Sequence, residues 1–119
     1  MAVKFTYADL TYLESMSMGS NELIVEMIQL FIDQLPEFTE GLVAHLTNSD
    51  YPALGALAHK AKSSVAVMGM NALAADLKTL ELSAKAGNDI SQYPVLINRF
   101  IEQVTLTGTE LGDYAKTLH

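Results

Sequence analysis

The sequence predicts an all-α fold, an antiparallel up-down four-helix bundle with a short additional N-terminal helix. Three observations indicate it. Apolar residues recur at steps of three and four over most of the chain, the period of a helix with one buried face. Roughly two to five residues separate the four longer segments, and helices joined by such short turns lie antiparallel to their neighbours. No segment carries the apolar–polar alternation of a strand.

The first element should be a short amphipathic helix over about residues 6–16, because Leu10 and Leu13 share one of its faces. Residues 17–21 then break the helical pattern. We therefore treat this segment as an addition to the bundle and not as one of its four helices.

The next helix should run from about residue 21 to residue 46. Ser20 or Asn21 is a good N-cap, and a continuous apolar band follows along one side. Pro36 lies inside this helix and removes one amide donor, so a kink is expected there rather than an end.

Three further helices complete the bundle. One should run over about residues 51–68, after a polar Asn-Ser-Asp cap, and stop at Gly69. The next should run over about residues 70–87 and form a hairpin with it. The last should end near Tyr114, with Pro94 in its first turn.

Composition limits the class of protein. A chain of 119 residues, of which 50% are apolar, predicts a single domain over residues 1–119 with one core. It contains no cysteine, so it has neither a disulfide nor a thiolate metal site. Neither a signal peptide nor an apolar run of about 18 residues is present, so the expected location is the cytoplasm and no membrane contact is expected.

The charge balance is acidic. Fourteen acidic residues against seven basic ones give a formal charge of −7. That charge repels phosphate backbones, and no basic patch interleaved with aromatic residues occurs, so nucleic acid is not an expected partner. The simplest explanation of the acidity is solubility.

Two leucines of the long second segment, Leu23 and Leu30, lie at the edge of its apolar band, outside the arc that a bundle core needs. With Met16 and Met18 they could form a small exposed apolar patch for a partner. Packing beneath the short N-terminal helix explains them equally well, and the sequence leaves both interpretations open.

The helix over residues 51–68 presents an uncovered histidine. On a helical wheel His59 lies about 150° from the centre of the apolar stripe and so points away from the core. Its neighbours at steps of three, four and seven residues are mostly small, where a surface helix usually carries long charged side chains. These neighbours are Gly55, Lys62, Ser63 and Ala66. Another protein could therefore approach the ring closely, and Lys62 could meet negative charge.

An exposed histidine supports several kinds of chemistry. Taken alone, a surface histidine without a role is the commonest case. Neither His45 nor His59 has a glutamate three residues before it, so the Glu-x-x-His pattern of di-iron bundles is missing and no metal site is expected. No nucleophile motif for hydrolysis is present. A neutral imidazole can instead take a phosphoryl group, a transfer that mainly requires positioning and charge neutralisation.

Residues downstream of His59 keep a fixed spacing without a gap, namely Lys62, Ser64, Gly69, Leu73, Leu80 and Glu81. This run resembles the signature of histidine-containing phosphotransfer (HPt) domains, approximately His-x-Leu-Lys-Gly-Ser-x4-Gly-Ala-x2-Leu-x6-Leu-Glu. Three positions depart from it: Ala61, Ser63 and Met70 stand where leucine, glycine and alanine are usual. None of these departures removes a group that the chemistry needs.

The resemblance implies both fold and function. HPt domains carry a phosphoryl group between aspartates of receiver domains, so His59 would be acceptor and donor, and Lys62 would offset charge on the transferred group. The implied partners are receiver domains of a hybrid sensor kinase and of a response regulator. These would supply Mg²⁺, so no cofactor is expected on this chain. The protein would be a monomeric phosphoryl carrier without kinase activity or an ATP site.

Two further residues have open roles. Counting residues along the hairpin from Gly69 places Glu81 near the level of His59. Its carboxylate could accept a hydrogen bond from Nδ1–H of His59 and leave the other ring nitrogen as the nucleophile. The Glu81 side chain could equally face solvent. Ser64 could orient a phosphate oxygen or bond to a backbone carbonyl, and its position toward the core favours the second. The expected partner surface comprises Gly55, Ser63, Ala66, Leu23 and Leu30.

The sequence also allows two other interpretations. A helical adaptor could bind a signalling partner through the Leu23 and Leu30 edge or the His59 face without carrying phosphate, but the His59–Lys62 pair argues against it. An HPt module excised from a larger hybrid kinase is the other, and the N-terminal Met and the self-contained helix count argue against that. His45 and His119 are assigned no role.

Overall fold

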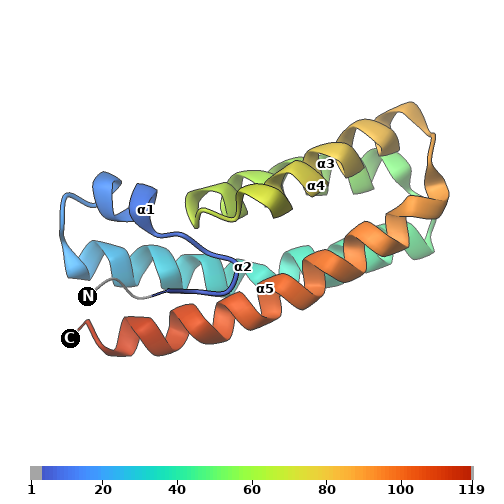
Figure 1. The fold of residues 1–119 in the computed structure, drawn as a ribbon. Helices are drawn as coiled ribbons and strands as arrows, with labels where there is room; N and C mark the ends of the chain where they lie inside the picture. The colour runs from blue at the N-terminus through green and yellow to red at the C-terminus, as the bar shows by residue number, and fades with distance from the viewer. Residues whose placement is uncertain (1–3, 119) are drawn as a thin grey trace.

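The computed structural model describes residues 4–118 and contains, within that range, five α-helices and one short 3₁₀ helix (Figure 1). They are α1 (Thr11–Met16), α2 (Asn21–Thr47), α3 (Tyr51–Val67), α4 (Asn71–Ala86), η1 (Ile90–Gln92) and α5 (Tyr93–Lys116). No strand occurs among the described residues, so the predicted all-α class is confirmed. His119 lies outside them.

The four long helices pack side by side in an elongated body of 45 × 20 × 20 Å. α2 packs against α3 and α5, α3 packs against α4, and α4 also contacts α5. Each of these helices runs opposite to the next one along the sequence (Figure 1). α2 and α5 extend beyond the α3–α4 hairpin at the end where both termini lie, and α1 covers α2 there.

One face of each long helix is buried in a common core, as the helical period predicts. On α3 the apolar stripe is buried, with Leu54, Ala58, Ala61 and Val65 all 0% exposed. Phe38 of α2 and the corresponding large side chains of α4 and α5 fill the centre. Burial of each large apolar side chain contributes roughly 1.5–3 kcal/mol. This core holds α3 and α4 in the fixed register on which the candidate site depends.

Side chains cap the helices at the predicted positions. Ser20 accepts a hydrogen bond from the backbone N–H of Leu23 at the start of α2, and Asp50 accepts from that of Ala53 at the start of α3. α2 continues through Pro36, so the proline does not end it, as predicted; the expected kink stays a prediction. No helix of the described residues is both long enough and apolar enough to cross a membrane.

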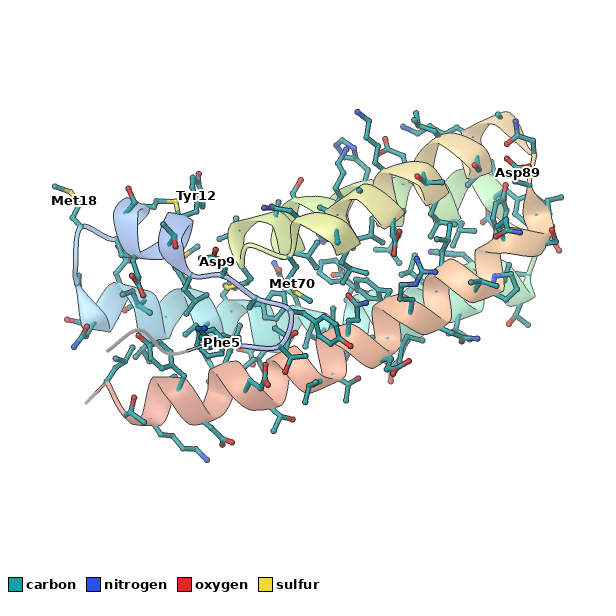
Figure 2. All side chains as sticks on the ribbon, viewed as in Figure 1. Phe5, Asp9, Tyr12, Met18, Met70 and Asp89 are labelled. Carbon is teal, nitrogen blue, oxygen red and sulfur yellow. The ribbon has the colours of Figure 1, made fainter. Side chains whose placement is uncertain are left out.

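The N-terminal helix is shorter than predicted. α1 begins at Thr11, whereas residues 4–10 form a non-helical strap that runs alongside α5 and then turns back to α1 (Figures 1 and 2). Thr6 donates from its backbone N–H and its hydroxyl to the carboxylate of Glu110 on α5, and Phe5 packs edge-on against Tyr114. These contacts with α5 hold the segment outside a helix, because a helix would turn Thr6 and Phe5 away from their partners.

Gly69 joins α3 to α4 at a point where the strap passes. Its φ is +73°, a left-handed conformation that residues with a side chain rarely adopt. The backbone N–H of Asp9 donates to the carbonyl of Met68 at 3.0 Å, and a Cβ on Gly69 would overlap the carbonyl oxygen of Asp9. Glycine is therefore favoured at position 69 for two reasons: the left-handed turn and the close approach of the strap.

The sequence did not predict η1, which follows α4 and leads directly into α5. The ring of Tyr93 is fully buried at this junction, and its hydroxyl lies 2.6 Å from the carbonyl oxygen of Asn88 and 2.8 Å from that of Ser83. Burial raises the pKa of the Tyr93 phenol. Tyr93 thereby holds in place the connection between α4 and α5, and α5 then packs against α2.

Candidate functional site

His59 lies on α3 with its ring largely in solvent. Its side chain is 60% exposed, while Ala58, its neighbour in sequence, is completely buried. Ser63 and Ala66, one and two turns further along α3, are also exposed. On this side of α3 the small side chains of Ser63 and Ala66 leave the ring uncovered.

Glu81 reaches His59 from the neighbouring helix. The α3–α4 hairpin places its two carboxylate oxygens 3.0 and 3.1 Å from Nδ1 of His59. The Glu81 side chain is only 8% exposed, whereas the imidazole above it is open. Of the two positions that the sequence left open for Glu81, the structure shows the one that faces His59.

Two lysines bind the same carboxylate. Lys85, one turn further along α4, places Nζ 2.7 Å from one oxygen, and Lys62 of α3 places Nζ 3.2 Å from the other. The hydrogen bond from Lys85 is the largest cause that lowers the pKa of Glu81 to about 2, against the opposing effect of burial; His59 and Lys62 lower it further. Glu81 is thus a carboxylate at any pH near neutrality.

The ionised carboxylate decides which ring nitrogen carries the proton. A carboxylate can only accept hydrogen bonds, so the Nδ1 atom of His59 must donate. In the neutral imidazole the lone pair then lies on Nε2, on the exposed side of the ring. The site therefore holds Nδ1 with the buried carboxylate and leaves the nucleophilic nitrogen, Nε2, on the other side of the ring.

Ser64 lies in a different environment. Its hydroxyl donates to the side-chain oxygen of Gln34 on α2 at 3.0 Å, so it links α3 to α2. Ser64 is half-buried, and its partner is a side chain rather than the backbone carbonyl that the sequence suggested. Its predicted role in orienting a phosphate oxygen stays a prediction.

Gly55 does not lie on the exposed face, and this prediction was wrong. The residue is buried under α4, where a Cβ would lie 3.3 Å from the carbonyl oxygen of Glu81 and 3.5 Å from Cβ of Ala84. The wheel places a residue only relative to its own helix, and α3 is covered by α4 as well as by α2. Gly55 allows the backbones of α3 and α4 to approach closely at the level of the site.

A shallow apolar groove of about 230 Å³ runs between α2 and α3, beyond Ser63. Its lining comprises Met27, Leu30, Phe31, Gln34, Ser63, Ser64, Val67 and Met68. Leu30 is 53% exposed at its rim and Leu23, further along α2, is 39% exposed. Met18 is 92% exposed and projects from the end of the molecule (Figure 2). These exposures favour an apolar patch over burial beneath α1.

Sequence reasoning missed Lys85 and Gln34. The position of Lys85 four residues after Glu81 is a helical ion-pair spacing and was available as a signal. The contact of Gln34 depends on the register between α2 and α3, which carries no local signal. Among the described residues, no group of three or more histidine, cysteine, aspartate or glutamate side chains is placed to hold a metal ion.

Comparison with known proteins decides the family. The family model described as "Hpt domain" matches residues 26–107, a span that includes His59, Glu81 and both lysines. The chain belongs to the Hpt domain family. Its role is accordingly that of a histidine phosphotransfer protein in a phosphorelay.

The Hpt assignment agrees with a solved structure. Histidine-containing phosphotransfer protein B (HptB) from Pseudomonas aeruginosa PAO1 superimposes with a TM-score of 0.86, with 96% of this chain and 98% of that chain covered. The two sequences are 24% identical, so the likeness concerns the fold. No curated protein matches this Hpt chain.

Proposed function

We propose that His59 is the phosphoryl acceptor and donor of this Hpt protein and that it reacts through Nε2. The observation that carries the proposal is the contact of Nδ1 with the buried carboxylate of Glu81 at 3.0 Å beneath an exposed ring. A carboxylate behind the ring also stabilises the positive charge that develops on the imidazole when Nε2 attacks.

The transfer itself needs no group from this chain beyond the imidazole and nearby charges. The Nε2 lone pair forms the N–P bond while the O–P bond of a partner's aspartyl phosphate breaks, and that electron pair returns to the aspartate carboxylate. The Nδ1 proton stays between His59 and Glu81. The reverse transfer to a second aspartate follows the same path.

Lys62 and Lys85 provide positive charge beside the ring. With Glu81 they form a local cluster of two positive charges and one negative charge, which favours a dianionic phosphoryl group nearby. Lys62 is 27% exposed and keeps the charge-neutralising role predicted for it. The Mg²⁺ of the reaction belongs, in this proposal, to the acidic pocket of the partner.

The partners are receiver domains, one of a hybrid sensor kinase and one of a response regulator. The side chains of Ser63 and Ala66 are small, so a receiver domain can approach His59 closely on this side. The apolar groove next to them can bind an apolar side chain of the receiver. Leu30 forms the exposed rim of that groove, and Leu23 extends the apolar surface along α2. We propose these four residues as the docking surface.

The protein acts as a monomeric cytoplasmic carrier without its own kinase activity, in an antiparallel four-helix bundle to which α1 is added. A formal charge of −7 disfavours nucleic acid as a partner. A phosphate-free helical adaptor and a module of a larger kinase are the competing proposals.

The test is transfer of label from a panel of receiver domains that have been phosphorylated on aspartate with radiolabelled acetyl phosphate in Mg²⁺. The wild type should take up label that is lost in acid and survives base, and His59→Gln should take up none. His45→Gln is the matched control, because His45 lies outside the site, and it should behave like the wild type. Absence of label on the wild type from every receiver would favour the adaptor.

A further inference from the structure

Lys85 lies over Gly55, across the boundary between α3 and α4. A Cβ built on Gly55 would lie 3.3 Å from Cγ of Lys85, so the bare backbone of this glycine leaves room for the lysine stem. Gly55 is also one turn before His59 on α3, and Lys85 is one turn after Glu81 on α4. The stem of Lys85 is thereby directed along the same face of the hairpin toward the carboxylate.

The contacts at Glu81 fix the carboxylate from both sides. Nζ of Lys85 donates to Oε2 at 2.7 Å, and Nζ of Lys62 donates to Oε1 at 3.2 Å. Nδ1 of His59 lies 3.0 Å from Oε2 and 3.1 Å from Oε1. A carboxylate held by a donor on each oxygen has little freedom to rotate about its last bond. Its plane is therefore set by the two lysines before a partner arrives.

We infer that Lys85, seated over Gly55, is a positioning residue that holds the Glu81 carboxylate in the orientation that receives Nδ1–H of His59. The inference rests on the proposed function of His59; it gives Lys85 a second role there and adds Gly55. Lys85 does not touch the imidazole in this arrangement. It acts on the reaction through Glu81.

The geometry favours Lys85 over Lys62 for this role. Nζ of Lys85 lies 2.7 Å from the Glu81 carboxylate, whereas Nζ of Lys62 lies 3.2 Å from it. Lys85 and Glu81 also belong to one helix, so their spacing does not depend on the packing of two helices. The side chain of Lys85 is 55% exposed, but the carboxylate that it binds is 8% exposed. An ion pair with one buried end is screened less by solvent than a fully exposed pair.

The test compares Lys85→Met, which keeps the stem and removes the charge, with Lys85→Arg, which restores a cation. Lys78→Met is the matched control, since Lys78 lies on α4 and forms no ion pair within residues 4–118. Two NMR readouts need no partner: the ¹³C titration of the Glu81 carboxyl and the ¹⁵N spectrum of His59. Transfer from a phosphorylated receiver domain is measured on the same variants.

Lys85→Met should raise the pKa of Glu81 from about 2 toward its ordinary value of 4.5 and reduce the share of His59 rings protonated on Nδ1. Transfer should slow by about tenfold, a part of the roughly hundredfold loss that misplacement of a reacting group can cause. Lys85→Arg should restore all three properties, and Lys78→Met should change none.

A substitution of Gly55 tests whether this glycine positions the Lys85 side chain. Gly55→Ala should displace the Lys85 stem and give a smaller change of the same sign, whereas Gly112→Ala, whose Cβ would meet Ile32 at an ordinary 3.6 Å, should give none. Unchanged Glu81 and His59 spectra in Lys85→Met would overturn the inference even if the wild type transfers phosphate. A wild type that takes no label would instead refute the proposed function, while the spectra would still decide the role of Lys85.

Discussion

Nδ1 of His59 lies 3.0 Å from a carboxylate oxygen of Glu81, although the two residues belong to different helices and are 22 positions apart. The hairpin at Gly69 creates this contact by setting α3 and α4 in register. The ring is 60% exposed and the carboxylate 8% exposed, so one partner is presented to solvent while the other is held in the protein. The chemistry of the exposed nitrogen follows from the acceptor behind it.

Glu81→Gln should slow phosphoryl transfer to His59 by about tenfold or more, because a neutral amide stabilises the charged imidazole less than a carboxylate does. The measurement is the initial rate of label transfer from a phosphorylated receiver domain. Glu102→Gln removes a charge from an exposed position of α5 and should leave the rate unchanged. Equal rates for the wild type and Glu81→Gln would show that the carboxylate does not assist the reaction.

Glu81 should also contribute to the pH dependence of stability. Its pKa in the folded protein is about 2, below the ordinary 4.5, so the contribution is complete above pH 4.5 and is lost as the pH falls toward 2. Hydrogen bonds to a charged group are worth roughly 1.5–3 kcal/mol. Urea unfolding at several pH values should therefore give a difference between the wild type and Glu81→Gln that shrinks through this range. A difference that stays constant down to pH 2 would contradict the assignment.

Gly69→Ala should destabilise the fold more than Gly87→Ala. Both glycines have a φ near +70°, namely +73° and +71°, and each substitution incurs about 1 kcal/mol for this conformation. Only at Gly69 does the added Cβ also overlap Asp9, since nothing lies within 4 Å of a Cβ at Gly87. Thermal unfolding of both variants measures the difference. Equal losses would mean that the strap moves aside freely.

Leu30→Ala should weaken docking of a receiver domain and raise KM for transfer several-fold, with little change in kcat, because the residue forms the rim of the groove and not the reaction site. Leu23→Ala should act in the same direction and less strongly. The control is Leu82→Ala on α4, which is 56% exposed against 53% for Leu30 and lies outside the groove. If Leu23→Ala and Leu30→Ala leave transfer unchanged, both residues are removed from the docking surface.

Much of the fold followed from local signals in the sequence. The caps at Ser20 and Asp50 and the left-handed glycines 69 and 87 mark helix ends by the conformations and hydrogen bonds that each residue type favours. The contact of His59 with Glu81 could be anticipated because both residues lie at similar distances from one turn. A count of residues along the hairpin placed them at one level but left open whether Glu81 faces the ring or the solvent.

The parts that the sequence did not reveal depend on contacts between distant segments. Thr6 meets Glu110 across 104 positions, and no local pattern indicates that the strap leaves the helical conformation to do so. Gly55 looked exposed because the wheel of α3 says nothing about where α4 crosses it. The spacing of Lys85 from Glu81 indicates an ion pair, but the burial of Glu81, which gives that pair its role, depends on how α3 and α4 pack.

The central claim is that His59 reacts through Nε2 while Glu81 holds Nδ1–H. The most direct measurement is the ¹⁵N and ³¹P NMR spectrum of ¹⁵N-histidine-labelled protein after transfer from a phosphorylated receiver domain. We expect a single phosphohistidine at residue 59, with phosphorus coupled to Nε2 and a proton on Nδ1. Phosphorus on Nδ1, or on any residue other than His59, would contradict it.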